Sequence, residues 1–555
     1  MSRAQPPVEP PVEPQDKPAG QRGSRDYDVA IIGYGPVGVT AANLLGARGL
    51  SVLVAERDGS VYARARAIAT DEEIIRIWQQ VGLAERLKQD MLWDKAIDFV
   101  DADGQSFLNF APQPRGNGHP TQLFIYQPAL EQVLREGVER FANVEVRLGT
   151  EVVRQTQDES GVELTLLDLG TNTVARERAT YVIAADGGSS PTRGQLGIGF
   201  EGRTYEDRWV VIDTKVLQEW PEVDRLRFHC NPARPAVDCP TPLGHHRWEF
   251  PVLPGDDEKE LVTEAAVRRL LVNQGVDPDN IEVLRAVIYS HHVRFAAKWR
   301  AGRIFLAGDA AHVMPPWIGQ GMASGVRDVN NLCWKLAGVI NGELPESVLD
   351  SYAPERMRHV RAMTAAAVFF GRVITERRRA VTAVRDPLFR AAMKAPFVGA
   401  FLRDGTWFPE TRYTEGFLGV AASKASSRRA GKLVGQLVPQ PWVQAADGAR
   451  TRLDDVLAGG WAVLHAAVER PTPALAWEQA GVPTLAVLRA GSSPAEDAIV
   501  DVDDVLVTWM RRYRVSTLAL RPDGIVFAAK ATGKPLATPP LLRTPSRGSR
   551  LEAAS

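Results

Sequence analysis

The sequence feature that most constrains the fold is the segment 28–57, which has the pattern of one complete βαβ unit. An apolar run at 29–32 is short enough for a buried strand, and small and apolar residues recur at helical spacing over 39–47. A second apolar run at 51–55 predicts another buried strand. The turn between the first strand and the helix carries the pattern G-x-G-x-x-G at 33–38.

Each glycine of this pattern, and the acidic residue after the second strand, has a physical role in holding a dinucleotide. Gly33 permits a sharp turn off the strand, Gly35 leaves room for a pyrophosphate, and Gly38 permits close packing of helix on strand. The free N–H groups at the helix N-terminus face the phosphates. Glu56 ends the second strand, where a carboxylate accepts both ribose hydroxyls and disfavours a 2′-phosphate. The unit therefore predicts FAD or NAD, and the alternative is a glycine-rich turn in an ordinary α/β domain.

Length and composition restrict the class of protein further. A chain of 555 residues predicts two to four domains, and a net charge of −1 gives no reason to expect nucleic acid or an anionic membrane as a partner. Its three cysteines, Cys230, Cys239 and Cys333, form neither a disulfide framework nor a metal-binding pattern, so no metal is expected. No apolar run is long enough to cross a membrane. Residues 1–26 lack core-forming side chains and predict a disordered tail, and the whole pattern predicts a soluble cytoplasmic protein.

Two later segments carry features that suit a nucleotide. Strand patterns within 144–184 lead into Asp186-Gly187, which places a carboxylate and backbone N–H groups after a buried strand. In the segment 302–325, another strand delivers Asp309 to its end, and a loop rich in Pro and Gly leads to a helix that begins near Gly321. Asp309 can accept hydroxyl protons from a polyol, and amides at a helix N-terminus stabilise negative charge. A ribityl chain and a reduced flavin have these two features.

Between these markers lie a predicted hairpin at 98–110, a helix from Gln127, and strand-like segments over 209–281 with a polar helix at 257–274. The last group indicates a second sheet domain inserted into the first.

Because the three markers occur in this order, residues 27–400 resemble the single-component FAD-dependent aromatic hydroxylases, the class A flavoprotein monooxygenases. Further matches resemble the 3-(3-hydroxyphenyl)propionate hydroxylases of that class, which use NADH and O₂ to make the 2,3-dihydroxy product, also from 3-hydroxycinnamate. These matches are Arg66-Ala-Ile, Phe124-Ile-Tyr-Gln-Pro, Cys230-Asn-Pro-Ala-Arg-Pro, Arg247-Trp-Glu-Phe and Gly308-Asp-Ala-Ala-His-Val-Met-Pro.

The resemblance implies an α/β fold with a Rossmann-like FAD-binding domain, an inserted β-sheet substrate domain and a C-terminal thioredoxin-like domain. The C-terminal part has no cysteine, so its expected role is packing or dimerisation, and a homodimer is expected. The expected boundaries are a tail at 1–26, the first part of the FAD-binding domain at 27–206, the substrate domain at 207–284, the second part with helices at 285–400, a linker at 401–430 and the thioredoxin-like domain at 431–555.

The resemblance also implies contacts with bound FAD and with NADH as co-substrate. Asp186 serves FAD and the passing nicotinamide nucleotide, Asp309 holds the ribityl chain, and residues from His312 onward surround the isoalloxazine. The implied FAD-binding residues are Gly33, Gly35, Pro36, Gly38, Glu56, Arg57, Arg66, Gln127, Asp186, Gly308, Asp309, His312, Pro315, Gly319, Gly321 and Met322.

The reaction implied is attack of a flavin C4a-hydroperoxide on a ring carbon ortho to a phenol, so the protein must exclude water and help the phenol to ionise. Ile68 stands where the phenol hydroxylases carry a carboxylate. The candidates to activate the phenol are therefore Asp71, Tyr289, His246 and His292. A carboxylated substrate also needs a cation, for which Arg247 and Arg294 are candidates. For all of these, an ordinary packing or surface role is the alternative.

Three other functions are alternatives. A hydroxylase of another phenol or of an aromatic polyketide would have the same flavin motifs. A flavin-dependent halogenase would carry Trp-x-Trp-x-Ile-Pro, which is absent. A non-catalytic binding module would not need the intact FAD-binding residues.

Overall fold

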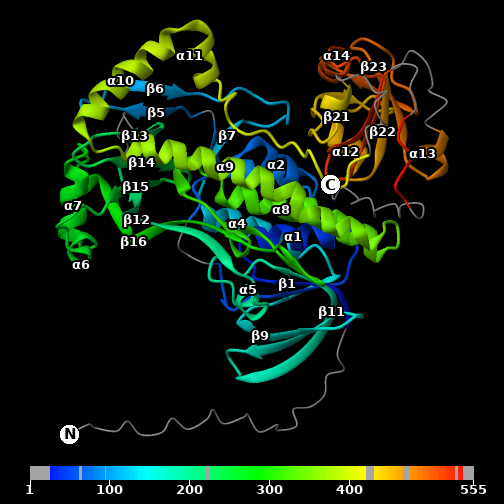
Figure 1. The fold of residues 1–555 in the computed structure, drawn as a ribbon, viewed down its shortest axis with the longest axis horizontal. Helices are drawn as coiled ribbons and strands as arrows, with labels where there is room; N and C mark the ends of the chain where they lie inside the picture. Colours follow the sequence, from blue (N-terminus) through cyan, green and yellow to red (C-terminus); the bar gives the residue numbers. More distant parts are fainter. Residues whose placement is uncertain are drawn as a thin grey trace.

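The computed structural model describes residues 26–61, 66–93, 95–218, 224–419, 430–466, 475–531 and 536–541. Residues 1–25 of the expected tail and residues 420–429 of the expected linker lie outside these residues. Within the described part, the strands form two eight-stranded sheets, one seven-stranded sheet and one three-stranded sheet. Figure 1 shows the C-terminal sheet standing apart from the larger body that contains the other three.

The first sheet confirms the predicted βαβ unit. Strand β1 (Asp26–Ile32) continues through helix α1 (Pro36–Gly46) to β2 (Val52–Ala55), which pairs with β1 in parallel. On the other side, β1 pairs in parallel with β11 (Thr173–Ala184), and β11 pairs in parallel with β18 (Ile304–Leu306). Because carboxyl ends of parallel strands meet at one edge, the three sequence markers come together there.

The remaining strands of this sheet extend its edges. β8 (Val144–Arg147) pairs with β2, β17 (Arg300–Ala301) pairs with β18, and β9 (Thr150–Gln157) and β10 (Val162–Asp168) form an antiparallel extension of β11. Helix α5 (Pro191–Gln195) follows β11. A separate small sheet has the order β3-β7-β4, and helices α2 and α3 lie between its strands in sequence. These elements are β3 (Ala69–Asp71), α2 (Glu72–Gln79), α3 (Ala84–Gln89), β4 (Met91–Trp93) and β7 (Gln122–Ile125).

Three further helices cover the first sheet. Helix α4 (Gln127–Val138) and helix α8 (Gly321–Ile340) both pack on α1, and α9 (Tyr352–Thr375) runs beside α8 (Figure 1). The predicted start of a helix near Gly321 is therefore confirmed. This packing fixes the N-termini of α1 and α8 at the same edge of the sheet.

The second sheet has the order β19-β16-β12-β15-β14-β13-β5-β6. It draws on more of the chain than the expected domain at 207–284, because the predicted hairpin at 98–110 joins it through parallel pairing of β5 with β13. The expected helix at 257–274 is two helices, α6 (Glu258–Leu261) and α7 (Glu264–Val272), each with its own side-chain cap. The strands are β5 (Ile97–Val100), β6 (Ser106–Phe110), β12 (Phe200–Val216), β13 (Leu226–His229), β14 (Ala236–Thr241), β15 (His245–Pro251), β16 (Ile281–Ala296) and β19 (His312–Val313).

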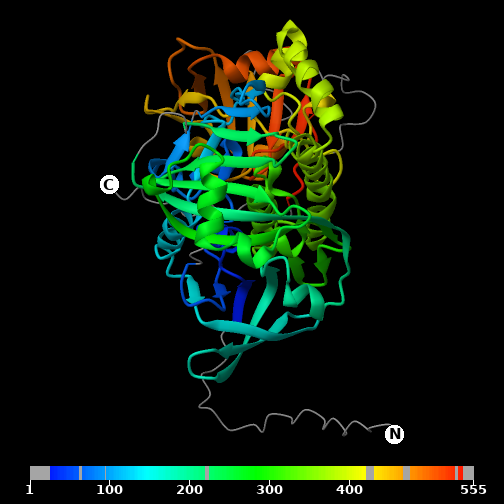
Figure 2. The ribbon, with the colours of Figure 1, turned by 90° about the vertical axis from the view of Figure 1, so that its left-hand side faces the viewer.

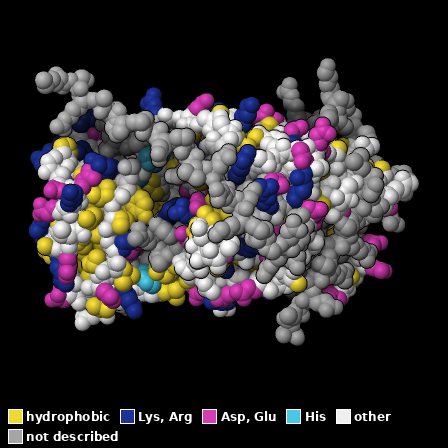
Figure 3. All heavy atoms as spheres, turned by 90° about the horizontal axis from the view of Figure 1, so that it is seen from below, with side chains coloured by type: hydrophobic (Ala, Val, Ile, Leu, Met, Phe, Trp, Pro, Cys, Tyr) yellow, Lys and Arg dark blue, Asp and Glu magenta, His cyan; other side chains and the backbone are white. Residues whose placement is uncertain are grey.

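Figure 2 faces the second sheet and shows helices α10 (Arg379–Lys394) and α11 (Pro396–Arg403) at its upper end, above β5 and β6. Seen from below in Figure 3, hydrophobic side chains gather on the left of the molecule, the side on which Figure 1 places this sheet and α6 and α7. No described helix is long and apolar enough to cross a membrane.

The C-terminal domain is a sheet of order β21-β20-β24-β23-β22-β25-β26. Strands β22, β23 and β24 are parallel, and β25 and β26 form an antiparallel hairpin, an arrangement consistent with the expected thioredoxin-like domain. The elements are β20 (Trp442–Gln444), β21 (Arg450–Arg452), α12 (Leu453–Leu457), β22 (Ala462–Ala466), α13 (Leu475–Gln479), β23 (Thr484–Leu488), β24 (Ala498–Asp501), α14 (Val505–Arg512), β25 (Thr517–Leu520) and β26 (Val526–Lys530).

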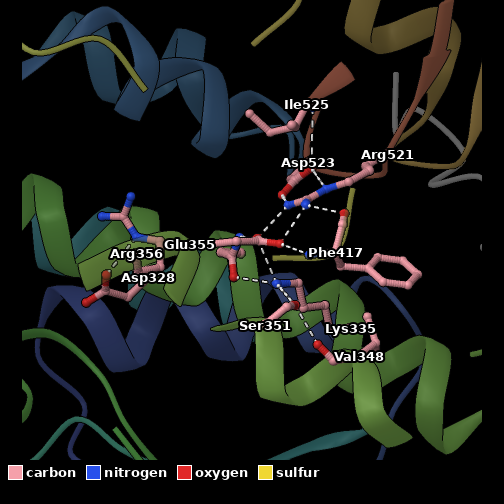
Figure 4. A network of polar contacts seen from close by, with 11 residues as sticks. Asp328, Lys335, Val348, Ser351, Glu355, Arg356, Phe417, Arg521, Asp523 and Ile525 are labelled. Atoms are coloured by element: carbon pink, nitrogen blue, oxygen red, sulfur yellow. Dashed lines mark hydrogen bonds and ion pairs between the residues drawn. The ribbon is translucent and has the colours of Figure 1, made fainter. Parts of the chain in front are cut away.

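A buried polar network joins this domain to the FAD-binding body (Figure 4). Both guanidinium Nη atoms of Arg521 donate to the Glu355 carboxylate of α9, at 2.9 and 3.0 Å, and Lys335 of α8 donates to it at 2.8 Å. Arg521, Glu355 and Lys335 have fully buried side chains. These partners lower the pKa of the Glu355 carboxyl to about 2, although burial alone would raise it. Arg76 of α2 forms a second tie through two hydrogen bonds to Asp454 of α12.

Candidate functional site

A cavity of about 720 Å³ lies where the carboxyl edge of the first sheet meets the second sheet. It has two parts. A groove runs along the ends of the parallel strands, and an apolar chamber lies beside the second sheet. The groove is lined by Gly35, Pro36, Val37, Arg66, Ala67, Gln127, Ala185, Gly187, Ala307, Asp309 and residues 319–322, and the chamber includes Phe99, Leu108, Phe110, Phe228, Val237, Phe370, Trp407 and Phe408.

The three glycines after β1 differ in what a side chain would meet. Gly33 has φ +98°, and a Cβ there would lie 2.5 Å from the carbonyl oxygen of Ala185. At Gly38, a Cβ would lie 1.9 Å from the carbonyl oxygen of Gly33. At Gly35, which lines the cavity, a Cβ would meet nothing within 4 Å. The first and third glycines therefore serve packing, whereas the second leaves open space in front of the N-terminus of α1, as a pyrophosphate requires.

Glu56 lies at the end of β2, half-buried, beside this turn. Its Oε2 accepts the backbone N–H of Tyr34 at 2.6 Å, and its Oε1 accepts that of Asp58 at 2.9 Å. A carboxylate oxygen has two lone pairs, so both oxygens retain capacity for ribose hydroxyls. The neighbouring Arg57 is largely exposed, and neither Glu56 nor Arg57 is among the residues that line the cavity.

The other end of the groove combines a carboxylate with a helix N-terminus. Asp309 follows β18 and lines the cavity, and burial raises the pKa of its carboxyl. Gly308, with φ +59°, is held by a hydrogen bond from its N–H to Asp328 at 3.1 Å, and a Cβ there would lie 2.9 Å from Val37. Gly319, Gly321 and Met322 line the same end, at the start of α8. At this end of the groove, the positive end of the α8 dipole and the Asp309 carboxylate, which can accept hydroxyl protons, both border the cavity.

Gln127 holds one wall of the groove in place. The backbone N–H groups of Arg66 and Ala67 both donate to its Oε1 at 2.7 Å, and its Nε2 donates to Glu131 at 2.7 Å. Gln127 therefore fixes the segment that brings Arg66 to the cavity wall.

Asp186 stabilises the turn between β11 and α5. Its Oδ1 accepts from the Ser190 hydroxyl at 2.6 Å and its Oδ2 from the backbone N–H of Thr192 at 3.0 Å, which stabilises the start of α5. Its neighbours Ala185 and Gly187 line the cavity, and Asp186 does not.

His312 and Pro315 lie behind the wall rather than in it. His312 is 1% exposed, its Nε2 is 2.7 Å from Asp328, and its ring packs against Trp299. Asp328 is also bonded to Arg356 at 2.9 Å. This placement departs from the expected contact of His312 with the flavin, because β19 pairs with β16 and turns the ring into the core. The lining residues of that loop are Val313, Met314, Pro316 and Trp317.

Of the candidates to activate a phenol, Asp71 lines the cavity but is committed to other partners. It caps α2 by accepting from the N–H groups of Glu73 and Ile74, and it also accepts from Gln320 at 3.1 Å and Arg327 at 2.7 Å. The Arg327 guanidinium lowers the pKa of the Asp71 carboxyl. A carboxylate stabilised in this way is a poor proton acceptor.

The other candidates lie outside the cavity. Tyr289, His292 and Arg294 are on β16, next to the edge strand β19, and do not line the cavity; His292 and Arg294 contact the Thr204 hydroxyl. His246 is buried on the face of β15 opposite to Arg247, 3.5 Å from Asp238, and its ring is tilted against that of Trp248 with the centroids 4.6 Å apart. These placements argue against direct contact of the four side chains with a substrate in this cavity.

Arg247 does line the cavity, because side chains alternate along β15 and its neighbour His246 takes the opposite face. Its Nε donates to Asp213 at 2.7 Å, and its Nη1 donates to the carbonyl oxygen of Arg66 at 2.9 Å. Asp213 also pairs with Arg285, and the bond to the Arg66 carbonyl holds the Arg66 segment against the second sheet.

Sequence reasoning missed two features of the chamber. Its walls are aromatic, with ring centroids 4.8 Å apart for Phe99 and Phe228 and 4.3 Å apart for Phe370 and Trp407. A second buried carboxylate, Glu249, lies on the cavity face of β15. The alternation in Arg247-Trp-Glu-Phe could have placed Glu249 beside Arg247.

The described residues contain no group of three or more His, Cys, Asp or Glu side chains that could hold a metal ion, and the three cysteines are buried.

Comparison with known proteins defines the class that this fold and cavity indicate. Residues 26–367 match the model of the FAD binding domain family, and residues 435–538 match the HcaD C-terminal domain. The chain belongs to this FAD-binding family and is an FAD-dependent aromatic monooxygenase. Among solved structures, the flavin-dependent monooxygenase PieE in complex with FAD and substrate matches with a TM-score of 0.75 at 23% identity, covering 91% of this chain and 96% of that chain. Aklavinone-11 hydroxylase with FAD and aklavinone matches with a TM-score of 0.73 at 22% identity, covering 93% and 97%. At these identities the likeness concerns the fold.

Curated relatives narrow the family. A 3-(3-hydroxy-phenyl)propionate/3-hydroxycinnamic acid hydroxylase 2 from Burkholderia vietnamiensis (strain G4 / LMG 22486) is 36% identical over 516 residues, which cover 90% of this chain and 93% of the relative. The similarly named hydroxylase from Comamonas testosteroni is 33% identical over 563 residues, covering 92% and 95%. The predicted resemblance to this group is therefore confirmed.

Proposed function

We propose that this protein hydroxylates 3-(3-hydroxyphenyl)propionate and 3-hydroxycinnamate ortho to the phenol, giving 2,3-dihydroxyphenylpropionate from the former, with NADH and O₂ as co-substrates. The observation that carries the proposal is the shared cavity, in which a groove suited to FAD opens directly into an aromatic chamber. The names of relatives at 33–36% identity over nine tenths of the chain support the substrate class.

The groove fits FAD on structural grounds. The open space at Gly35 and the N-terminus of α1 suit a pyrophosphate, and the N-terminus of α8 suits a flavin ring. The carboxylate of Glu56 suits a ribose, and that of Asp309 suits a ribityl chain. Gln127 and Arg247 hold the Arg66 segment over the groove from two sides. Asp186, Gly308, His312 and Pro315 support the wall without being part of it.

Bound FAD, once reduced by NADH, supplies O₂ activation and transfers one oxygen atom to the ring. The protein's own contribution is to position the ring and keep water away. Phe99, Phe228, Phe370 and Trp407 provide flat apolar surfaces that bind an aromatic ring and exclude water from the reacting carbon.

The propionate group requires a cation that is not already neutralised. Arg247 is paired with Asp213, and Arg294 lies outside the cavity. Arg115 lines the cavity, and its guanidinium is held by the carbonyl oxygens of Phe408 and Gly405, which fix its position without cancelling its charge. We therefore assign carboxylate recognition to Arg115, in place of Arg247 and Arg294.

The test is NADH oxidation by the purified yellow protein with and without 3-(3-hydroxyphenyl)propionate, with the product identified by mass spectrometry. Strong stimulation and the addition of one oxygen atom are expected. Slow NADH oxidation that this compound leaves unchanged would contradict the substrate assignment and leave the monooxygenase class intact.

A hydroxylase of another phenol or of an aromatic polyketide is the second candidate. The observation that favours it is the extent of the cavity, which continues past the chamber to Trp509, Arg512 and Tyr513 of the C-terminal domain. A panel of larger phenols in the same assay separates the two.

A further inference from the structure

Glu249 occupies an unusual position in the chamber wall. On β15, His246, Trp248 and Phe250 face α6 and α7, and Arg247 and Glu249 face the cavity. Glu249 is 8% exposed. Its carboxylate therefore lies inside the protein and reaches open space only through the cavity.

The neighbours of Glu249 across the sheet are apolar. Val211 of β12 and Val237 of β14 lie directly opposite it, and the row continues through Phe228 to Phe99. Phe99, Phe228 and Val237 line the same chamber. The residues next to Glu249 in this row on the neighbouring strands therefore offer its carboxylate no hydrogen-bond donor from their side chains.

Three neighbouring carboxylates of the cavity wall, Asp71, Glu72 and Glu73, are bonded within the protein. Asp71 and Glu73 bond Arg327, and Glu72 accepts the backbone N–H groups of Arg115 and Asn117. No hydrogen bond or ion pair joins Glu249 to another residue within the described part of the chain. Buried polar groups are nearly always bonded, so the structure indicates that the missing partner comes with a ligand.

The charged and titratable groups that face Glu249 are few. They are Arg247 on the same strand, Asp213 on β12 and the thiol of Cys239 on β14. Burial raises the pKa of the Glu249 carboxyl above its ordinary value, Asp213 adds to this, and Arg247 opposes it. Arg247 shares Asp213 with Arg285, and the pKa of Glu249 remains raised although Arg247 opposes the shift. A carboxylate with a raised pKa is better suited to accept a proton near neutral pH.

We propose that Glu249 accepts the hydroxyl proton of the phenol during hydroxylation. The proposal rests on the function proposed above. The O–H bond of the phenol breaks as its proton moves to a Glu249 oxygen, and the ring carbon ortho to it forms a C–O bond to the oxygen atom supplied by O₂ and NADH-reduced FAD. The second oxygen atom of O₂ leaves as water. The proton lost from that ring carbon joins this second oxygen atom, which restores aromaticity, and the original phenol oxygen regains its proton from Glu249.

The test compares Glu249→Gln with Glu249→Asp in the FAD-loaded full-length protein. Glu264→Gln is the matched control, because Glu264 lies on α7 with its side chain 74% exposed. Each protein receives 3-(3-hydroxyphenyl)propionate and a ring-fluorinated analogue with a more acidic phenol. Three quantities are measured, namely the rate of flavin reduction by NADH, the yield of hydroxylated product, and the yield of H₂O₂.

For Glu249→Gln, we expect flavin reduction within about twofold of the unmodified protein and hydroxylation slower by about 100-fold or more, since a positioned general base contributes that much. NADH consumption then yields H₂O₂ in place of product. The loss shrinks to less than about tenfold with the more acidic phenol, because that substrate needs less help to ionise. Glu249→Asp and Glu264→Gln retain hydroxylation to within about tenfold and twofold, respectively.

An equal loss with both phenols would overturn the assignment and indicate a structural role for Glu249, with the proposed function standing. Unchanged hydroxylation in Glu249→Gln would overturn it as well. If Glu249→Gln fails to bind FAD, Glu249→Asp decides: a loss that is equal for the two phenols contradicts the proposal. Absence of product from the unmodified protein with both phenols would overturn the proposed function and this assignment together.

Discussion

Two alanine substitutions three residues apart should separate the role of the cofactor from that of the fold. Gly35 lies at the start of α1 with φ −71° and ψ −174°, a conformation that alanine adopts without strain, and its Cβ would meet nothing within 4 Å. Gly35→Ala should therefore change the free energy of unfolding of the FAD-free protein by less than about 1 kcal/mol. The added methyl group occupies the space that a pyrophosphate needs. Losing one charge-assisted hydrogen bond of about 1.5–3 kcal/mol weakens FAD binding by about 10- to 140-fold.

Gly38→Ala should act on the fold instead. A Cβ at Gly38 would lie 1.9 Å from the carbonyl oxygen of Gly33, so α1 has to move away from β1 by more than an ångström. Overpacking of this kind costs about 1–3 kcal/mol or more, and it is felt with or without FAD.

The assay for both variants is urea unfolding without FAD and with saturating FAD, together with titration of the FAD-free protein by flavin fluorescence. The reasoning would be refuted if Gly35→Ala destabilised the FAD-free protein as much as Gly38→Ala does, or if it bound FAD as tightly as the unmodified protein.

The remaining predictions concern the ribityl acceptor, the network between domains and a buried histidine. Asp309→Ala should release FAD on gel filtration with unfolding unchanged, because Asp309 faces the cavity; normal flavin occupancy would contradict its role. Arg521→Leu should lower the free energy of unfolding by about 3–5 kcal/mol, since it leaves buried carboxylates without their cation; a change below about 1 kcal/mol in urea unfolding would count against this. Burial lowers the pKa of His119 to about 3, so the folded protein holds it neutral while the unfolded chain takes up a proton near pH 6.5. Stability should therefore fall as the pH drops from about 6.5 towards 3, and His119→Asn should flatten that dependence in urea unfolding at several pH values.

The cofactor half of the site was predictable because its signals are local. The turn at Gly33, Gly35 and Gly38 is encoded within a few residues, and parallel pairing of β1, β2, β11 and β18 then brings the later markers to the same edge. The position of His312 behind the cavity wall was not predictable, because its orientation depends on the pairing of β19 with β16, which no local pattern encodes.

The substrate half was not predictable to the same degree. The chamber draws on the strand pair β5–β6 and the strand pair β13–β14, which lie more than 100 residues apart in sequence, so its aromatic wall is visible only once their pairing is known. Which side of β15 faces the chamber decides between His246 and Glu249, and a shift of one residue in register would exchange them. The role of Asp71 was open to prediction, because an Asp before Glu72-Glu73 and an apolar helix is a typical helix cap.

Helix α8 begins at the flavin groove with Gly321 and carries Lys335 into the network that receives Arg521 from the C-terminal domain. For protein engineering, this makes the boundary near residue 430 a poor place to recombine family members. A chimera that exchanges the last domain must keep Lys335, Glu355 and Arg521 as a matched set, since any mismatch places an uncompensated charge beside the helix whose other end forms the cofactor groove. Crossovers that move α8, α9 and the C-terminal domain together should preserve flavin binding, whereas crossovers between them should not.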